Sequence, residues 1–456
     1  MTDPVLTPVP GEPRLLLGAY RLEELGYTRR EFFMSGTASS YGSAAESREA
    51  DYTTRIVVIA PAAGVAFNGT VIVEWLNVSG GIDAPAVWFM AHRELIREGY
   101  AYVAVSAQLV GVEGGASLAG VDMSLKAQDA ERYAPLSHPG DALSYDIYSQ
   151  AGRLVRSGAI GGLRADVVLA AGESQSAMFL TTYVNDIDPR EQIYDGFLVH
   201  SRFGSAAPLD GSSALDAGTG PVPFRDDLRV PVIAVLTETD VLDGHLIGYH
   251  RARRPDGDHF RAWEIAGAAH ADNYTIRVSF IDNGLAPLHD LVAAYRPTDV
   301  LMGQQLTYCI NFAPQHHYVL QAAVAALHRW VRSSVPAPAA PPLALTDGDT
   351  VGLVLDRNGL AAGGVRTPWV DVPVARTSGT APDESAMSFL FGSGELFDAN
   401  TVRRLYPGGP TEYLDRFTQA LDLAIESGFI VPADRSEILE LAAEPAVWDT
   451  GTVGLS

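Results

Sequence analysis

Apolar runs with strand propensity recur along the chain, and they predict the main elements of its fold. Several are continuous rather than alternating, as expected for parallel strands that are buried on both faces. The predicted strands cover residues 55–60, 70–76, 100–106, 167–171, 196–200, 231–236 and 260–265.

Amphipathic helical patterns separate these strands, and they cover residues 87–98, 142–157, 176–184 and 318–331. Regular alternation of strands and helices predicts an α/β fold with a mostly parallel central sheet and helices on both faces. The segment "SVPAPAAPP" at 334–342 is rich in Pro and Ala and predicts a linker or a surface strap. Beyond it, turn residues dominate, with one clear helical pattern near 413–427.

One strand-to-helix junction carries a candidate nucleophile. The stretch "AAGESQSA" takes the chain from a predicted strand into a helix with Ser174 at the turn. This resembles the nucleophile elbow G-x-S-x-G, in which small residues flank a strained serine. Gly172 fits that pattern, whereas Ser176 stands where the second glycine is expected. The alternative is an ordinary serine that caps the helix.

A serine nucleophile needs a base and an orienting acid, which follow it in the order acid, then histidine. The strand at 231–236 runs into a loop with two acids, of which Asp240 is favoured as the orienting acid. Glu238 is the reserve acid and a candidate residue of the substrate pocket. The strand at 260–265 runs into a small-residue turn and then His270, the favoured base. His316 and His317 are rival bases, and we expect them to serve as pocket or cap residues.

An oxyanion hole needs two N–H donors near the serine. The N–H of Gln175 is one candidate, and the loop Asn77-Val78-Ser79, which follows the strand at 70–76, is expected to supply the other. Trp75, Trp88, Phe89 and the segment 281–312 are candidates for an apolar acyl pocket. Ordinary core packing is the alternative for each of them.

Composition narrows the range of partners and locations. The 456 residues carry 32 basic and 55 acidic side chains, a net charge of −23, which disfavours binding to nucleic acid or to anionic membranes. With Cys309 as its one cysteine, the chain can form neither an internal disulfide nor a cysteine-based zinc cluster. The N-terminus has no secretory pattern and no apolar stretch is long enough for a membrane helix, so we expect a cytoplasmic protein.

A set of short motifs resembles those of the bacterial alpha/beta hydrolase domain proteins. They are "VEWLNVSGG", "SAQLVGV", "RYAPLSHPGDALSYDIYSQ", "AAGESQSA", "DGFLVHSR", "GAAHAD", "GGVRTPWVDVP" and "LYPG". The resemblance runs from about residue 31 to the end of the chain. It implies an α/β-hydrolase fold and a carboxylesterase-like activity, with the nucleophile at Ser174 and the late histidine at His270. It also implies that residues 363–373 belong to the hydrolase body.

These observations together predict a serine hydrolase that cleaves small-molecule carboxylic esters through an acyl-enzyme, without a metal or an organic cofactor. An acyltransferase with the same Ser-His-Asp triad and a non-catalytic binding protein on the same fold are the alternatives. We expect a single α/β-hydrolase domain over residues 1–456, with a cap or pocket insertion at about 271–314 and a C-terminal extension at about 335–456 that packs on it. The sequence does not predict an oligomeric state.

Overall fold

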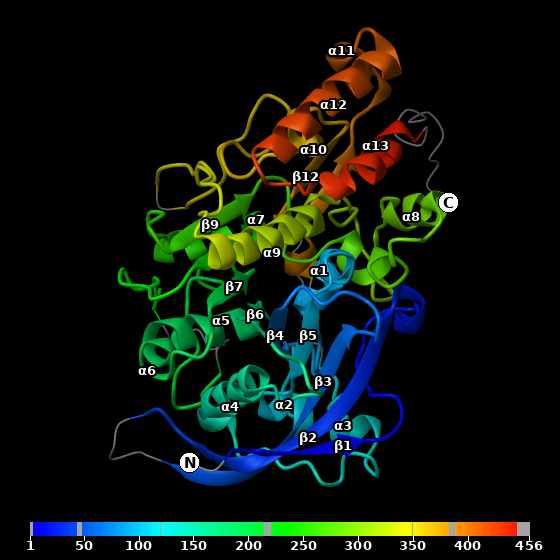
Figure 1. Cartoon of the computed structure of the whole chain (residues 1–456). Helices are drawn as coiled ribbons and strands as arrows, with labels where there is room; N and C mark the ends of the chain where they lie inside the picture. Colours follow the sequence, from blue (N-terminus) through cyan, green and yellow to red (C-terminus); the bar gives the residue numbers. More distant parts are fainter. Residues whose placement is uncertain are drawn as a thin grey trace. The chain divides into compact units, whose positions relative to one another are not determined.

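The computed structural model describes residues 3–42, 48–118, 120–213, 220–348, 350–382 and 388–444. The chain divides into two compact units, each built from several segments. The first unit comprises Met1–Ala234, Gly244–Arg261 and Leu327–Pro336, and the second comprises Val235–Asp243, Ala262–Ala326 and Ala337–Ser456. The elements are labelled in Figure 1.

Over the described residues, the main sheet has nine strands in the order β1-β2-β3-β5-β4-β6-β7-β8-β9. β4 pairs in parallel with β5 and β6, and β6 with β7, whereas β1, β2 and β3 form an antiparallel edge. β8 and β9 begin in the first unit and end in the second. The strands are β1 (Val5–Val9), β2 (Tyr27–Ser39), β3 (Glu49–Pro61), β4 (Thr70–Trp75), β5 (Ala101–Val105), β6 (Val167–Glu173), β7 (Gly196–His200), β8 (Val232–Thr237) and β9 (Phe260–Ile265).

Helices cover both faces of the sheet in the first unit, and two consecutive residues of β4 show why. Successive side chains of a strand point to opposite faces. Trp75 packs on one face against Tyr148 of α4 (Ser144–Ser157) and Phe179 of α5 (Gln175–Thr182), at ring-centroid distances of 4.8 and 5.1 Å. Glu74 points to the other face, where its carboxylate accepts hydrogen bonds from the first N–H groups of α1 (Ala86–Arg97).

Glu74 thereby caps α1 from a neighbouring strand. The residue before α1 is Pro85, whose side chain makes no capping hydrogen bond. The Glu74 oxygens accept from the N–H groups of Val87 (2.8 Å) and Trp88 (3.1 Å) and from the Tyr102 hydroxyl (2.6 Å). Burial raises the pKa of Glu74 to about 8, while these three donors work in the opposite direction. The start of α1 is therefore fixed to the sheet.

The predicted strands and helices are found within a few residues of their expected positions, but the antiparallel edge was not predicted beyond part of β3. β2 carries Arg29, Arg30 and Glu31, which obscure its apolar pattern. Glu31 is buried and forms an ion pair with Arg132, and it lies 3.9 Å from the fully buried Arg55. In a sequence, the charged residues of a buried ion pair cannot be told from surface residues, so they do not indicate a buried strand.

The second unit has its own aromatic core. The helix α9 (Gln315–Ser333) begins in this unit, and Tyr318 joins a buried cluster with α12 (Gly409–Glu426) and α13 (Arg435–Ala443). Two short antiparallel strands, β12 (Ala375–Ser378) and β13 (Ser393–Leu396), belong to the same unit. The main buried members of the aromatic cluster are Tyr318, Phe397, Tyr406, Tyr413, Phe417, Leu421 and Ile438.

The remaining elements are short. The α-helices are α2 (Leu109–Glu113), α3 (Leu125–Gln128), α6 (Asp188–Glu191), α7 (Glu238–Val241), α8 (Leu288–Tyr295), α10 (Pro368–Asp371) and α11 (Ala399–Leu405), and β10 (Val300–Leu301) pairs with β11 (Gln304–Gln305). Single 3-10 turns cover Leu22–Leu25, Asp141–Leu143, Tyr249–Ala252, Ser388–Phe391 and Pro432–Asp434, and π-helical turns cover Tyr183–Ile187 and Tyr274–Val278.

One of the five points at which the chain passes from one unit to the other falls between Pro336 and Ala337, inside the predicted linker. The C-terminal residues share the second unit with the segment that carries His270. Val365 forms a parallel bridge with Ile265 at the end of β9, and its N–H donates to Glu264 O at 2.6 Å. The expected division into one hydrolase domain, a cap insertion and an extension stays a prediction.

None of the helices in the described part of the chain is both long and apolar enough to cross a membrane. The cytoplasmic location and the absence of nucleic-acid and membrane partners stay predictions.

Candidate active site

Ser174 occupies a strained turn between β6 and α5. Its backbone angles are φ 55° and ψ −118°, and α5 begins at the next residue, Gln175. A non-glycine residue in such a region costs about 1–3 kcal/mol, so the surrounding structure must hold it there. The Ser174 side chain makes no capping hydrogen bond to α5, so the capping alternative is not what the structure describes.

Three contacts hold this turn. The Ser174 N–H donates to His200 O at the end of β7 (2.9 Å). The Ser176 hydroxyl donates to Glu173 O (2.8 Å) and accepts from the Glu173 N–H (3.0 Å). Ser176 is fully buried, so its hydroxyl fastens the turn at the position where the elbow pattern has a glycine. This accounts for the departure from G-x-S-x-G.

Gly172 is the position at which the turn does require glycine. A Cβ atom there would lie 2.8 Å from Leu180 Cδ1 and 3.2 Å from the backbone C and O atoms of Ser176. A larger residue would require the Leu180 side chain to move and the Ser176 backbone to shift by a few tenths of an ångström.

The loop after β4 is tied to the serine turn by Asn77. The Asn77 side-chain amide donates to the Glu173 backbone oxygen (3.1 Å) and to Glu173 Oε2 (2.9 Å). Because Glu173 directly precedes Ser174, this loop and the serine lie side by side within the first unit. Glu173 was not singled out in the sequence, and no local pattern there indicates its contact with Asn77.

Of the three loop residues predicted as oxyanion donors, Val78 has the one N–H that remains available. The Asn77 N–H donates to Ala84 O (3.0 Å), and the Ser79 N–H donates to Asn77 Oδ1 (2.8 Å). The Val78 N–H makes no hydrogen bond to any described residue. Gln175 is the first residue of α5, where an N–H has no partner within the helix.

Asp240 and His270 form a buried pair in the second unit. His270 Nδ1 lies 2.6 Å from Asp240 Oδ1, and Asp240 is fully buried. Asp240 Oδ2 accepts from the Thr237 N–H (2.7 Å) and hydroxyl (2.8 Å), which makes a capping box at the start of α7. A carboxylate only accepts hydrogen bonds, so Nδ1 carries a proton, and in the neutral form of such a ring Nε2 is the basic atom.

Thr237 and Thr239 were not predicted as site residues. Thr237 fixes Asp240, and the Thr239 hydroxyl accepts from the His270 N–H at 3.1 Å. The spacing of Thr237 and Asp240 in "TETD" matches the capping-box pattern, in which a threonine is followed by an acid three residues later. The sequence therefore carried a signal for Thr237.

Glu238, the reserve acid, has a different set of partners. Its oxygens accept from the N–H groups of Gly267 (2.5 Å) and Gly379 (2.8 Å) and from the Ser378 hydroxyl (2.9 Å). Burial raises the pKa of Glu238 to about 7, and these donors oppose that shift. Glu238 thus joins the turn before His270 to the C-terminal segment, and its assignment to a substrate pocket stays a prediction.

His316 and His317 are both fully buried at the start of α9. The ring of His317 stacks on Tyr274 at 3.7 Å and its Nε2 lies 3.0 Å from the Tyr295 hydroxyl. Burial lowers the pKa of His316 to about 4, helped by nearby His270 and opposed by Asp240 and the backbone of Ala269. His316 is therefore a neutral neighbour of the Asp240–His270 pair at neutral pH.

The aromatic residues proposed for an acyl pocket in the first unit lie in its core. Trp75 is fully buried and donates through Nε1 to Gln108 Oε1 at 3.1 Å. Trp88 is also fully buried and packs against Tyr102 at 5.0 Å, and Phe89 is 7% exposed. Neither tryptophan presents surface to a ligand, which favours the core-packing alternative.

The structure thus brings Asp240 together with His270, and the loop of Val78 together with the turn of Ser174. Ser174 belongs to the first unit and the Asp240–His270 pair to the second. The combination of the three residues into one triad stays a prediction.

A parallel sheet flanked by helices, with a strained serine at the end of a central strand, defines a protein of the α/β-hydrolase class. The chain belongs to the alpha/beta hydrolase domain family, whose sequence profile matches residues 4–440. This confirms the family resemblance and the fold expected from the sequence. No curated protein sequence matches the chain.

Several solved structures are similar over part of the chain. A putative dienelactone hydrolase from Klebsiella pneumoniae is 16% identical, with a TM-score of 0.33 over 58% of this chain and 95% of that one. An esterase from Pyrococcus furiosus is 10% identical, with a TM-score of 0.30 over 55% and 86%. A serine hydrolase without a lid from Xanthomonas campestris is 16% identical, with a TM-score of 0.26 over 45% and 72%. These likenesses are too low to support an argument about activity.

We expect Gly172→Ala to destabilise the protein, because the added methyl group overlaps Leu180 and the Ser176 backbone. Overpacking of this kind costs about 1–3 kcal/mol. Urea unfolding measures the change, with Gly244→Ala as the control, since a Cβ at Gly244 has no atom within 4 Å. Equal stability of the two variants would contradict the close approach at Gly172.

We expect His316 to make stability depend on pH. Its pKa is about 4 in the folded protein and about 6.5 when exposed, so the unfolded chain takes up a proton first as the pH falls. Stability from this residue is complete above pH 6.5 and is lost toward pH 4, with about 2 kcal/mol lost by pH 5. Between pH 7 and pH 5, the free energy of urea unfolding of the wild type should fall by about 2 kcal/mol relative to that of His316→Gln, since the other titratable groups are common to both proteins.

The exposed His289 supplies the control for this experiment, because its imidazole is largely solvated in the folded protein. His289→Gln should keep the pH dependence of the wild type. If His316→Gln also keeps it, the pKa of His316 does not change on folding and our account of its environment is wrong.

Proposed function

We propose that the protein is a serine hydrolase that cleaves small-molecule carboxylic esters, with Ser174 as nucleophile, His270 as base and Asp240 as the orienting acid. The observation that carries the proposal is the backbone of Ser174, held at φ 55° between a strand and a helix with its hydroxyl free of any capping bond. A serine that served only to start a helix would not need this strain. Membership of the alpha/beta hydrolase domain family supports the same chemistry.

In the first half-reaction, Ser174 Oγ attacks the ester carbonyl carbon and its proton passes to His270 Nε2. The charged imidazolium is stabilised by the Asp240 carboxylate, which also holds the Nδ1–H in place. Collapse of the tetrahedral intermediate breaks the bond to the alcohol oxygen, and His270 returns the proton to that oxygen. The products are the free alcohol and an acyl group on Ser174.

In the second half-reaction, water takes the place of the alcohol. His270 removes a proton from water as its oxygen attacks the acyl carbon, and the second intermediate collapses to release the carboxylic acid. The proton on His270 returns to Ser174 Oγ. Ester and water are consumed and acid and alcohol are formed, so the steps balance with these reactants alone.

Both tetrahedral intermediates carry a negative oxygen that needs donors. We assign these donors to the N–H groups of Gln175 and Val78. Support comes from the position of Gln175 at the start of α5, whose dipole favours an anion there, and from the availability of the Val78 N–H beside the Ser174 turn. Loss of one such donor typically costs about 3 kcal/mol of transition-state stabilisation.

An acyltransferase would use the same first half-reaction and replace water by another alcohol or an amine. Product analysis with and without an added acceptor separates the two activities. A non-catalytic binding protein would show no turnover with any ester.

We expect Ser174→Ala to abolish hydrolysis of a short p-nitrophenyl ester, with kcat reduced by about 10³-fold or more. Ser201→Ala is the matched control. Ser201 is also a fully buried serine with a positive φ, 51°, but it follows β7 and is not part of the proposed mechanism. Its substitution should leave kcat within about tenfold of the wild type. Comparable losses in both variants would show that a general effect of replacing a buried, strained serine, and not loss of the nucleophile, explains the result.

We expect Asp240→Asn to reduce catalysis and Glu238→Gln to reduce stability. Asp240→Asn should lower kcat by about 10⁴-fold, because an amide favours the wrong tautomer of His270. Glu238→Gln should lower the free energy of unfolding through its lost contacts with Gly267 and Gly379, and leave kcat within about tenfold. Steady-state kinetics and urea unfolding of both variants test this, and the reverse ranking in kcat would move the acid to Glu238.

A further inference from the structure

The second unit contains an apolar cavity that none of the proposed reacting residues lines. About 150 Å³ of it is free for a ligand, the size of a cavity that holds one aromatic ring, and the open mouth brings the empty space to about 920 Å³. Neither Asp240 nor His270 is among the lining residues. The lining is mainly aliphatic and aromatic, as at Tyr295, Phe312 and Trp369, with Arg296, Thr377 and Glu444 as the polar members.

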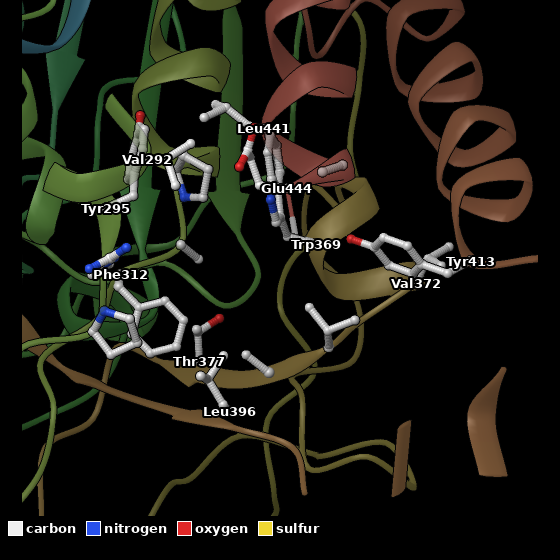
Figure 2. Close-up of a pocket in the computed structure, with 17 residues that line it drawn as sticks. Val292, Tyr295, Phe312, Trp369, Val372, Thr377, Leu396, Tyr413, Leu441 and Glu444 are labelled. Carbon is white, nitrogen blue, oxygen red and sulfur yellow. The ribbon is translucent and has the colours of Figure 1, made fainter. Parts of the chain in front are cut away.

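The walls come from segments far apart in the sequence. Figure 2 shows Tyr295 and Phe312 on one side of the cavity, Thr377 and Leu396 below it, and Val372 and Tyr413 on the other side. The sequence led us to expect that residues 281–312 line an apolar pocket, and Val292, Tyr295 and Phe312 do line this one. Its use as an acyl pocket stays a prediction.

The aromatic walls are held by contacts outside the cavity. The Tyr295 hydroxyl lies 3.0 Å from His317 Nε2, and the Trp369 ring stacks on Tyr318 at 5.7 Å with an interplanar angle of 4°. Phe417 packs edge-on against Trp369 at 5.6 Å. A cavity whose lining is fixed before a ligand arrives loses little conformational entropy on binding.

Two charged side chains border the cavity, Arg296 and Glu444. The Arg296 guanidinium makes no ion pair or hydrogen bond with any described residue, although its backbone oxygen accepts from Asn273 at 2.8 Å. A guanidinium is weakly hydrated and pairs with anions through two parallel N–H bonds. The carboxylate of Glu444 is more strongly hydrated than the guanidinium of Arg296. An anionic ligand that pairs with Arg296 therefore removes less bound water than a cationic ligand that pairs with Glu444.

From these features we propose that the cavity is a binding site for a small apolar molecule with one anionic group, such as an aromatic or aliphatic carboxylate. The apolar part fills the space between Tyr295, Phe312 and Trp369, and the anion pairs with Arg296 at the mouth. Binding here requires no catalysis, so the proposal does not depend on the proposed function.

The test uses two fluorescent probes that differ by one charge, 1-anilinonaphthalene-8-sulfonate and the uncharged N-phenyl-1-naphthylamine. Both are titrated into the full chain carrying Ser174→Ala, so that no ester chemistry intervenes. We expect saturable binding of both probes with one site per chain. Arg296→Gln should weaken binding of the sulfonate about three- to fivefold and leave the uncharged probe unchanged.

Two further variants fill the cavity from opposite walls. Ala375→Phe acts from β12 and Val292→Trp from α8, and each should weaken both probes at least about tenfold. Two walls are used so that one variant remains informative if the other fails to fold, as judged by circular dichroism. Arg190→Gln is the matched control for Arg296→Gln, because Arg190 is an exposed arginine in the other unit and its loss removes the same charge.

Absence of saturable binding to the full chain would overturn the proposal. Binding that the filling variants leave unchanged would also overturn it, since the probes would then lie elsewhere. Equal effects of Arg296→Gln and Arg190→Gln on the sulfonate would refute the assignment of the anion to Arg296. Ester turnover is measured in none of these titrations, so each outcome leaves the proposed function untouched.

Discussion

The left-handed backbone of Ser174 is the constraint on which the candidate site depends. Strain at one residue persists only where its neighbours determine it, and here they do so from three directions. His200 of β7 accepts the Ser174 N–H, the Ser176 hydroxyl bonds both backbone groups of Glu173, and Gly172 lets α5 approach β6. The same turn exposes the N–H of Gln175 at the start of α5 and places the Val78 loop beside it through Asn77. One local conformation therefore positions the proposed nucleophile and both proposed oxyanion donors.

Two neighbouring carboxylates of the second unit, Glu238 and Asp240, have different hydrogen-bond partners. Asp240 bonds Thr237 through one oxygen and His270 through the other, so the residue that caps α7 also fixes the imidazole. Glu238, two residues earlier, bonds Gly267 and Gly379 and so joins the turn before His270 to the C-terminal segment. Each carboxylate is buried, and each accepts several hydrogen bonds that reduce the cost of burial. The hydrogen-bond partners, and not the residue type, separate the orienting acid from the structural one.

Much of this arrangement could be predicted from the sequence because it depends on local patterns. Continuous apolar runs predicted the buried strands, and the elbow pattern identified Ser174. The strand-then-loop positions of Asp240 and His270 predicted the contact between them.

The features that the sequence did not predict depend on contacts between distant segments. Glu31 and Arg55 are charged residues buried in strands, and nothing near Glu173 indicates its bond to Asn77. Trp75 looks like a pocket residue in the sequence, but its neighbours Tyr148 and Phe179 come from other segments and enclose it.

Covalent labelling with diisopropyl fluorophosphate tests the central claim, the activated nucleophile at Ser174, most directly. This reagent reacts with serines that a neighbouring base activates, so it reports on Ser174 and His270 together. Intact-mass measurement should show one adduct per chain, peptide mapping should place it on Ser174, and the Ser174→Ala protein should remain unlabelled. An adduct on another residue, or ester turnover by a chain that the reagent does not label, would contradict the account.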